Sequence, residues 1–395
     1  MKPPTDHIFE QTPETLTAWC VSRGMPKFRG GQILEWVYEK GVIDPTLMTN
    51  LSKRERDVLA AEMTFLSGTI VAHKKASDGV QKLLLQWHDA DASQAAASSG
   101  DAGDGLSLEV LGATGVATAD SARQTECVMI PALPDSEDEG RRTACISSQI
   151  GCPVGCKFCA SGLGGLDGNL SAGRIVEQVW RLRVALRETE GSPDGKFPRI
   201  TNVVFMGMGE PLANFGPVTA AIRTLNALWG MAISARKITI STVGLPAAIE
   251  RLADEFELPV TLALSLHAPT DDIRRGLIPW AEYTSIDALL AACQKWFDKT
   301  GREITLEYTL LRGINDRPEH AEELSRLART LRANVNIIRY NEVAGLPFQR
   351  PLDQDVRAFQ GVLRERRINS HIRASRGRDI AAACGQLRHE AKAAK

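Results

Sequence analysis

The chain has 395 residues, 43% of them hydrophobic, and its 47 basic and 48 acidic side chains leave a formal net charge of −1. This length allows two or three domains, one of them a large α/β body, and the charge excludes an evenly basic nucleic-acid-binding protein. Because no long apolar run and no signal peptide are found, we expect a cytoplasmic protein that does not enter a membrane.

The beginning of the chain predicts a small helical domain at residues 1–75. Ile33, Leu34 and Val37 recur at helical spacing, and residues 51–59 suggest another helix. Basic side chains in this region make it a candidate for contact with RNA.

The next unit, residues 76–142, is expected to be a pair of strands with an insertion between them. Strands are predicted at 80–87 and 126–130, and they could pair with each other. The intervening residues, about 89–123, are rich in Ala, Ser, Gly and Asp, and we expect an inserted, mobile loop there.

From residue 143 the pattern changes to short β-rich runs that alternate with amphipathic helices. The expected strands are 143–147, 200–205, 237–241, 260–265, 304–310 and 334–339, and the expected helices are 172–187, 216–229, 245–257, 285–299, 318–332 and 353–367. Repeated βα units imply a parallel sheet, so the predicted fold is α/β, a partial (βα)6 barrel over residues 143–350. Residues 351–395 would form a C-terminal helix and a tail whose basic residues either meet phosphates or solvate a helix face.

Three cysteines carry the strongest chemical signal. Cys152, Cys156 and Cys159 follow a C-x3-C-x2-C spacing, and three such thiolates can hold three corners of a four-iron, four-sulfur (4Fe-4S) cluster while the fourth iron stays open to a small molecule. A structural zinc site would need four ligands in two separated pairs, and no partner pair occurs elsewhere in the sequence. The spacing therefore favours the cluster over zinc.

Other polar or glycine-rich stretches come at the same topological position, the carboxyl end of a predicted strand. They are residues 207–211 (Gly-Met-Gly-Glu-Pro), 241–244, 265–267 and 340–342. A glycine-rich turn or a lone histidine is usually structural, but together with the cysteines these stretches would all face one mouth of the barrel. The sequence thus predicts a site at that mouth.

With these motifs in hand, the chain resembles the radical S-adenosylmethionine (SAM) enzymes and, more narrowly, the RlmN/Cfr family of RNA adenine methyltransferases. The most similar stretches are 143–159, 201–211, 265–269 and 376–387, the last of which contains Ala-Cys-Gly-Gln. The resemblance runs from about Phe28 to Leu387. It implies that Cys152, Cys156 and Cys159 bind the cluster and that SAM is bound by Gly209, Glu210, Ser241, Ser265, Leu266, His267 and Asn341.

The resemblance also implies a catalytic set of Glu126, Cys145 and Cys384 and two SAM molecules per turnover. One SAM methylates the Cys384 sulfur, and the second is cleaved to a radical that takes a hydrogen from this methyl group, so that its carbon adds to adenine. Glu126 then removes the ring proton, and the Cys145 thiolate attacks the Cys384 sulfur, which leaves a disulfide for cellular thiols to reduce.

From the residues alone, the catalytic set has simpler interpretations. Cys384 would be a small buried residue before a glycine at a helix end, and Cys145 would be a packing residue or a fourth cluster ligand. Glu126 would be a carboxylate on the surface of a strand.

The implied substrate is adenosine 2503 of 23S rRNA, methylated at carbon 2, with adenosine 37 of tRNAs as a second target. The implied partners are these RNAs and a low-potential electron donor such as flavodoxin, and we expect a monomer. Two departures from the family pattern are the 89–123 insertion and Asp167-Gly-Asn-Leu170, which lacks the usual Arg.

Three alternatives stay open. The first is methylation of carbon 8, as in the Cfr branch that confers antibiotic resistance, although residues 376–380 look more like the carbon 2 branch. The second is an iron-sulfur RNA-binding protein without methyl transfer, and the third is a radical SAM enzyme that acts on a small molecule.

Overall fold

The computed structural model describes residues 2–89, 123–133, 140–192 and 195–387. Its main feature is one sheet in which ten strands follow the order β1-β2-β3-β4-β7-β8-β9-β10-β11-β12. The expected insertion at 89–123, apart from its two end residues, and the last residues of the basic tail lie outside the described residues.

Six parallel neighbours in this sheet correspond to the six expected strands. They are β4 (Arg142–Cys145), β7 (Asn202–Phe205), β8 (Ile238–Thr242), β9 (Thr261–Ser265), β10 (Ile304–Leu310) and β11 (Ala333–Arg339). A further strand, β12 (Ser370–Arg373), adds to β11 in parallel and was not expected. The predicted partial (βα)6 barrel is therefore confirmed, with one extra strand at its edge.

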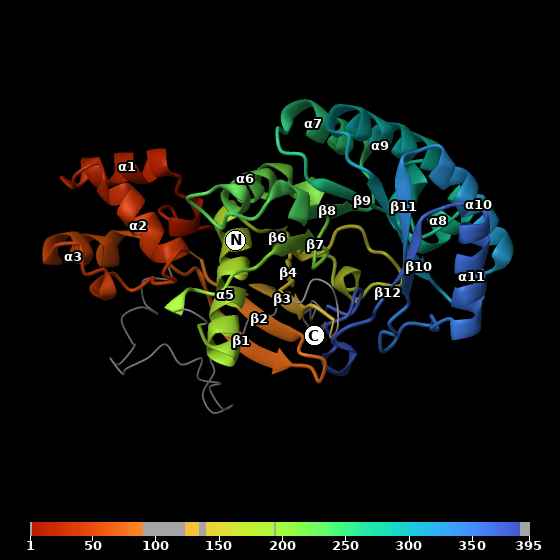
Figure 1. Ribbon diagram of the computed structural model, residues 1–395, viewed down its shortest axis with the longest axis horizontal. Coiled ribbons are helices and arrows are strands. Elements are labelled where there is room, and N and C mark those ends of the chain that lie inside the picture. Colours follow the sequence, from red (N-terminus) through yellow and green to blue (C-terminus); the bar gives the residue numbers. More distant parts are fainter. Residues whose placement is uncertain (1, 90–122, 134–139, 193–194, 388–395) are drawn as a thin grey trace.

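Helices cover the convex side of the curved sheet, as Figure 1 shows for the part coloured green to blue. They are α5 (Ala172–Glu190), α6 (Phe215–Asn226), α7 (Pro246–Glu255), α8 (Asp271–Leu277), α9 (Ile286–Thr300), α10 (Pro318–Arg329) and α11 (Asp353–Glu365). One of these helices, or two between β9 and β10, lies in each connection from one strand to the next parallel one. The carboxyl ends of the strands therefore gather at one rim, as a βα barrel requires.

The other edge of the sheet is antiparallel. β2 (Gln81–Trp87) pairs with β3 (Gln124–Pro131), so the two strands expected on either side of the insertion do pair. β1 (Gly68–Lys75) pairs with β2, although the sequence analysis placed these residues in the helical part. Most side chains of β1 are exposed or half-buried, and this edge strand has no clear alternation of apolar and polar residues that would reveal it.

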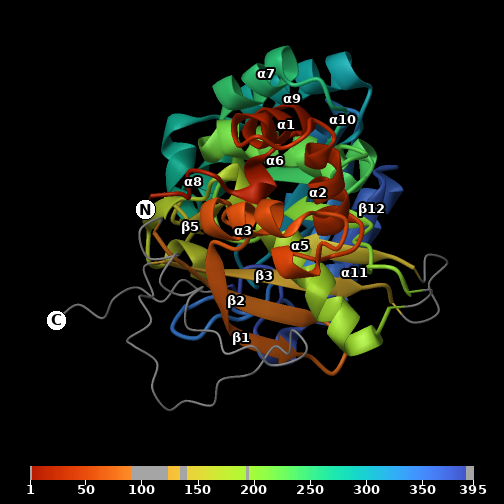
Figure 2. The same ribbon diagram turned by 90° about the vertical axis from the view of Figure 1, so that its left-hand side faces the viewer.

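The N-terminal helices α1 (Pro13–Ser22), α2 (Arg29–Tyr38) and α3 (Lys53–Glu62) lie together at one end of the molecule (Figures 1 and 2). They dock on α5, where the Trp180 indole N–H donates to the Val37 carbonyl oxygen at 3.0 Å and the Arg183 guanidinium donates to the Tyr38 carbonyl oxygen at 2.8 Å. Buried side-chain donors on α5 thus satisfy backbone carbonyl groups at the carboxyl end of α2, which have no partner within that helix. None of the helices in the described residues has the length and apolar character needed to cross a membrane.

Candidate active site

Two neighbouring cavities, an inner and an outer one, are lined by the parallel strands. The inner cavity lies at the carboxyl ends of the strands, and the outer cavity extends to their amino-terminal halves, where Thr143, Thr239 and Thr305 line it. The inner cavity, about 160 Å³, is lined by Cys152, Cys156, Cys159, Gly209, Glu210, Ser241, Ser265, His267 and Cys384, among others. The outer cavity, about 670 Å³, contains Cys145, Asn341 and Cys384 in its lining. Five residues line both cavities and form a partition between them: Met206, Glu307, Ile338, Arg373 and Cys384.

The cysteine triplet lies on a loop that begins after the short strand β5 (Gln149–Gly151). The backbone N–H of Cys152 donates to the Gly165 carbonyl oxygen at 2.8 Å, and that of Cys159 donates to the Cys156 carbonyl oxygen at 3.1 Å. Burial raises the pKa of the Cys152 thiol to about 12, and burial together with the neighbouring thiols raises the pKa of Cys156. Three neighbouring, half-buried thiols are stable as thiolates only beside a strong positive charge.

Glu210 is buried in the loop after β7, and its carboxylate ties this loop to the residue that follows β8. Its Oε1 accepts from the Leu212 N–H at 3.0 Å, and its Oε2 accepts from the Val243 N–H at 2.8 Å. Burial raises the pKa of this carboxyl group to about 6. The preceding Gly209 has φ +105°, and a Cβ there would lie 2.7 Å from the Ser148 hydroxyl oxygen, so only glycine allows the backbone to border the cavity so closely.

Two serines and a histidine continue the wall of the inner cavity. The hydroxyl oxygens of Ser241 and Ser265, at the ends of β8 and β9, lie 3.2 Å apart. His267 adopts a left-handed conformation with φ +57°, and its Nδ1 accepts from the Thr309 N–H at 3.1 Å. Burial lowers the pKa of His267 to about 3, so the ring is neutral at physiological pH. Leu266, also predicted for this site, has a fully buried side chain that belongs to the main hydrophobic core.

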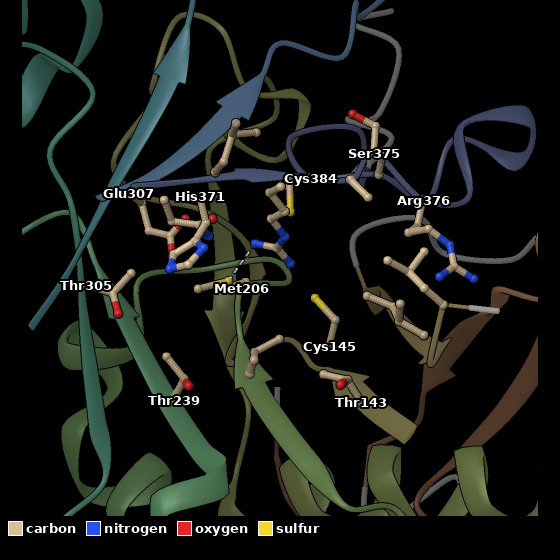
Figure 3. A pocket seen from close by; sticks show the side chains of 18 of the residues that line it. Thr143, Cys145, Met206, Thr239, Thr305, Glu307, His371, Ser375, Arg376 and Cys384 are labelled. Atoms are coloured by element: carbon tan, nitrogen blue, oxygen red, sulfur yellow. Dashed lines mark hydrogen bonds between the residues drawn. The ribbon is translucent and has the colours of Figure 1, made fainter. Parts of the chain in front are cut away.

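Cys145 and Cys384, far apart in the sequence, line the same outer cavity. Figure 3 shows both side chains there, with Met206 close by. Cys145 ends β4 and is buried, which raises the pKa of its thiol to about 12. Cys384 lies in a turn rather than before a helix end, and its carbonyl oxygen accepts from the Asn341 Nδ2 at 3.2 Å. The simpler interpretation of Cys384 as a helix-end residue is therefore wrong.

Arg373, at the end of β12, is a site residue that sequence reasoning missed. Its Nη1 donates to the Met206 sulfur at 3.3 Å, and the pKa of its guanidinium is raised by Cys384 first, and then by Glu307 and Cys145. The sequence analysis counted Arg373 only among the basic residues of the tail. The sequence signal that could have revealed Arg373 is a seventh βα repeat. Recognising this repeat would have placed Arg373 at the same rim as the other strand ends.

Glu126 takes a different position from the two cysteines. It lies on β3, lines neither cavity, and forms a buried ion pair in which the Lys82 Nζ lies 2.7 Å from its Oε1. It is buried rather than on the strand surface, contrary to the simpler interpretation.

Comparison with known proteins decides the family. Residues 7–64 match the ribosomal RNA large subunit methyltransferase N-terminal domain, and residues 146–327 match the radical SAM superfamily. A protein of Opitutus terrae named "Probable dual-specificity RNA methyltransferase RlmN 3" is 41% identical over 98% of this chain and 94% of its own length. A Salinibacter ruber protein with the same name, without the number, is 39% identical over 95% of this chain and 92% of its own. The chain belongs to the RlmN family.

The fold agrees with this membership. The crystal structure of a radical SAM methyltransferase from Sphaerobacter thermophilus matches with a TM-score of 0.82 and 37% identity, covering 98% of this chain and all of the other. The family resemblance and the radical SAM type of the predicted barrel are thus confirmed. As a radical SAM protein, the chain takes a 4Fe-4S cluster and SAM.

The residues of the inner cavity fit both cofactors. Its thiols cannot easily ionise without an added positive charge, which cluster iron supplies. Next to them, Glu210, Ser241 and Ser265 offer the acceptors and hydroxyl groups that the amino, carboxylate and ribose groups of SAM can use.

Proposed function

We propose that this chain is a radical SAM RNA methyltransferase that methylates carbon 2 of adenosine 2503 in 23S rRNA, and adenosine 37 in tRNAs, through a methylated Cys384. The names of the RlmN relatives support the RNA substrate. The observation that carries the intermediate is the position of Cys384, which lines both the inner cavity with the cysteine triplet and the outer cavity with Cys145. A radical formed in the inner cavity could abstract a hydrogen atom from a methyl group on this sulfur. The target adenine could reach the same group from the outer cavity.

The target atom explains why a displacement reaction is insufficient. Carbon 2 of adenine lies between two ring nitrogens, is electron-poor and has no lone pair with which to attack the methyl group of SAM. With cluster and SAM bound, the inner cavity would supply a radical that removes a hydrogen atom from the methylated Cys384. The resulting methylene radical can then add to the adenine ring, although carbon 2 is not nucleophilic.

Release of the product falls to Glu126 and Cys145. Glu126 would take the proton from carbon 2, acting as a general base, and the radical adduct would give up its unpaired electron, for which the oxidised cluster would be the acceptor. The Cys145 thiolate would attack the Cys384 sulfur, so that an S–S bond forms, the bond between sulfur and methylene carbon breaks, and that carbon takes up a proton to become the new methyl group. Cellular thiols would reduce the disulfide for the next turnover.

The other residues that the sequence analysis predicted for this site are proposed to bind cofactors. Cys152, Cys156 and Cys159 would ligate the cluster, while Gly209, Glu210, Ser241, Ser265, His267 and Asn341 would border SAM. Leu266 would contribute only through its backbone, because its side chain is in the core. The carboxylate of Glu210 would accept from the amino group of SAM, and the paired hydroxyl groups of Ser241 and Ser265 would hold its ribose and carboxylate groups.

The division into residues 1–75, 76–142, 143–350 and 351–395 stays a proposal, except that residues 68–75 form β1 and belong with the sheet. The N-terminal helices are proposed as an RNA-contacting domain. A low-potential electron donor such as flavodoxin, a monomeric state and a cytoplasmic location stay predictions. For RNA contact, the target base must leave its stack to enter the outer cavity.

The decisive experiment is anaerobic reconstitution of the cluster, reaction with methyl-labelled SAM and fragments of 23S rRNA and tRNA, and mass spectrometry of the adenosines. We expect labelled 2-methyladenosine from both RNAs. Methylation at carbon 8 would replace the carbon 2 assignment with that of the antibiotic-resistance branch. The absence of any methylated base would contradict the RNA substrate class.

A further inference from the structure

The segment that carries Cys384 is held from two sides. Residues 377–387, called here the carrier segment, contact the cysteine loop where the Ala160 N–H donates to the Gly385 carbonyl oxygen at 2.8 Å and the Ser161 hydroxyl donates to the Leu387 carbonyl oxygen at 2.8 Å. These bonds connect the segment to the inner cavity. Its other side faces the hairpin of β1 and β2.

Two kinds of contact join the hairpin to the carrier segment. At the turn, the Asp78 carboxylate accepts from the Arg376 Nε at 2.9 Å and from the Gly377 N–H at 2.9 Å. On β2, the Lys82 Nζ donates to the Ala381 carbonyl oxygen at 3.0 Å. The contacts of Asp78 reach only the start of the segment, whereas that of Lys82 lies three residues before Cys384.

Lys82 differs from Asp78 in a second respect, because it also binds Glu126. Its Nζ lies 2.7 Å from the Glu126 Oε1, and the side chains of Lys82 and Glu126 are only 8% and 9% exposed. A carboxylate that is so deeply buried needs an opposite charge within hydrogen-bonding distance to remain an anion. One ammonium group therefore supplies the charge next to the proposed base and also fixes the backbone that presents the methyl-carrying sulfur.

We propose that Lys82 is a positioning residue that couples Glu126 to the Cys384 segment, so that the base stays charged and aligned with the adduct formed on that sulfur. This inference rests on the proposed function. Lys82 transfers no proton or electron itself. Its role begins after the methylene carbon has joined the base, when the proton of carbon 2 must pass to the Glu126 carboxylate while the C–H electron pair stays with the adduct.

The test compares Lys82→Met with Asp78→Asn in the reconstituted enzyme. Three quantities are measured: methylation of Cys384, covalent protein–RNA adduct and released methyladenosine. For Lys82→Met we expect methylation of Cys384 within about twofold of the unmodified protein, and release lowered about tenfold to a hundredfold with accumulation of adduct. This loss is smaller than the roughly hundredfold to ten-thousandfold contribution of a general base, because Lys82 acts only through Glu126. Lys82→Arg should restore much of the release, because it keeps the cation. Asp78→Asn should leave the ratio of adduct to product unchanged, whatever it does to the folded fraction.

A merely structural role for Lys82 predicts another pattern, in which Lys82→Met and Asp78→Asn lower all three quantities in proportion. That pattern, or normal release by Lys82→Met, would overturn the inference. Glu126→Gln separates this outcome from failure of the proposed function. If Glu126→Gln accumulates adduct while Lys82→Met does not, only the role of Lys82 is wrong. If Glu126→Gln releases product normally, Glu126 is not the base and both ideas fail.

Discussion

Two groups of cysteines meet at this site, and their surroundings differ. Cys152, Cys156 and Cys159 come from one loop, and burial raises the pKa of all three thiols, with a further contribution from neighbouring loop thiols at Cys152 and Cys156. Cys145 and Cys384 come from distant parts of the chain, and Arg373 is their charged neighbour. The protein supplies a cation to each group, Arg274 beside Cys156 and Arg373 beside Cys145 and Cys384. One guanidinium cannot balance three thiolates, so the loop cysteines need further positive charge from a cofactor, whereas the proposed disulfide step needs only one thiolate.

This difference suggests a division of labour. Burial raises the pKa of Cys145 to about 12, and Arg373 acts in the opposite direction, so it favours the thiolate that the proposed disulfide step needs. Arg373 lies in the partition between the cavities and acts on both Cys145 and Cys384. Substitutions in the two groups should therefore have separable effects.

The largest expected effect is that of Cys384→Ser compared with Cys156→Ser. Cys384→Ser should abolish methyladenosine, because a serine hydroxyl group does not accept the methyl group that the radical step needs. It should leave bound iron unchanged, because residue 384 is not a proposed cluster ligand. Cys156→Ser should abolish methyladenosine and should also lower the amount of bound iron. Iron content, the visible absorption of the cluster and labelled product measure this contrast, and loss of iron in Cys384→Ser would erase the distinction between the groups.

Cys145→Ser should come next. The adduct should form and persist, since no thiolate attacks the Cys384 sulfur, and released product should fall by roughly a hundredfold or more, as is usual for loss of a reacting nucleophile. A protein band crosslinked to labelled RNA on a denaturing gel would show it. Normal turnover with no crosslink would mean that Cys145 is only a packing residue.

Arg373→Met should have a smaller effect on the same step. Without the guanidinium, the pKa of Cys145 rises further, and each unit lowers the thiolate fraction about tenfold, so release should slow by about that factor. Arg373→Lys is the matched control that keeps a positive charge. The lifetime of the adduct after a single turnover measures both variants, and equal lifetimes in both and in the unmodified protein would contradict the electrostatic role.

The smallest expected effect is that of pH on release. Because the pKa of Cys145 is raised to about 12, its thiolate is the minor form at neutral pH and increases with pH. A step from pH 7.5 to 8.0 should therefore shorten the adduct lifetime about threefold. In Cys145→Ser this dependence should vanish, and a flat profile in the unmodified protein would show that another step limits release.

Several of these residues could be found from the sequence and others could not. The C-x3-C-x2-C spacing and the motifs after predicted strands pointed to the rim, because βα repeats place every strand end on the same side. The pairing of 80–87 with 126–130 was also readable. In contrast, β1 and β12 were missed, since short or exposed edge strands lack the apolar pattern that reveals central strands.

By itself, the sequence determined the barrel, the triplet and the family, because these depend on local spacing and on repeated units. Only the tertiary structure decided that Arg373 lies beside Cys384 and is not part of a solvated tail. It also decided that Lys82 contacts both Glu126 and the carrier segment, and that the side chain of Leu266 is in the core. These facts depend on contacts between residues far apart in the chain. No local pattern encodes which buried charge will meet which partner when the sheet closes.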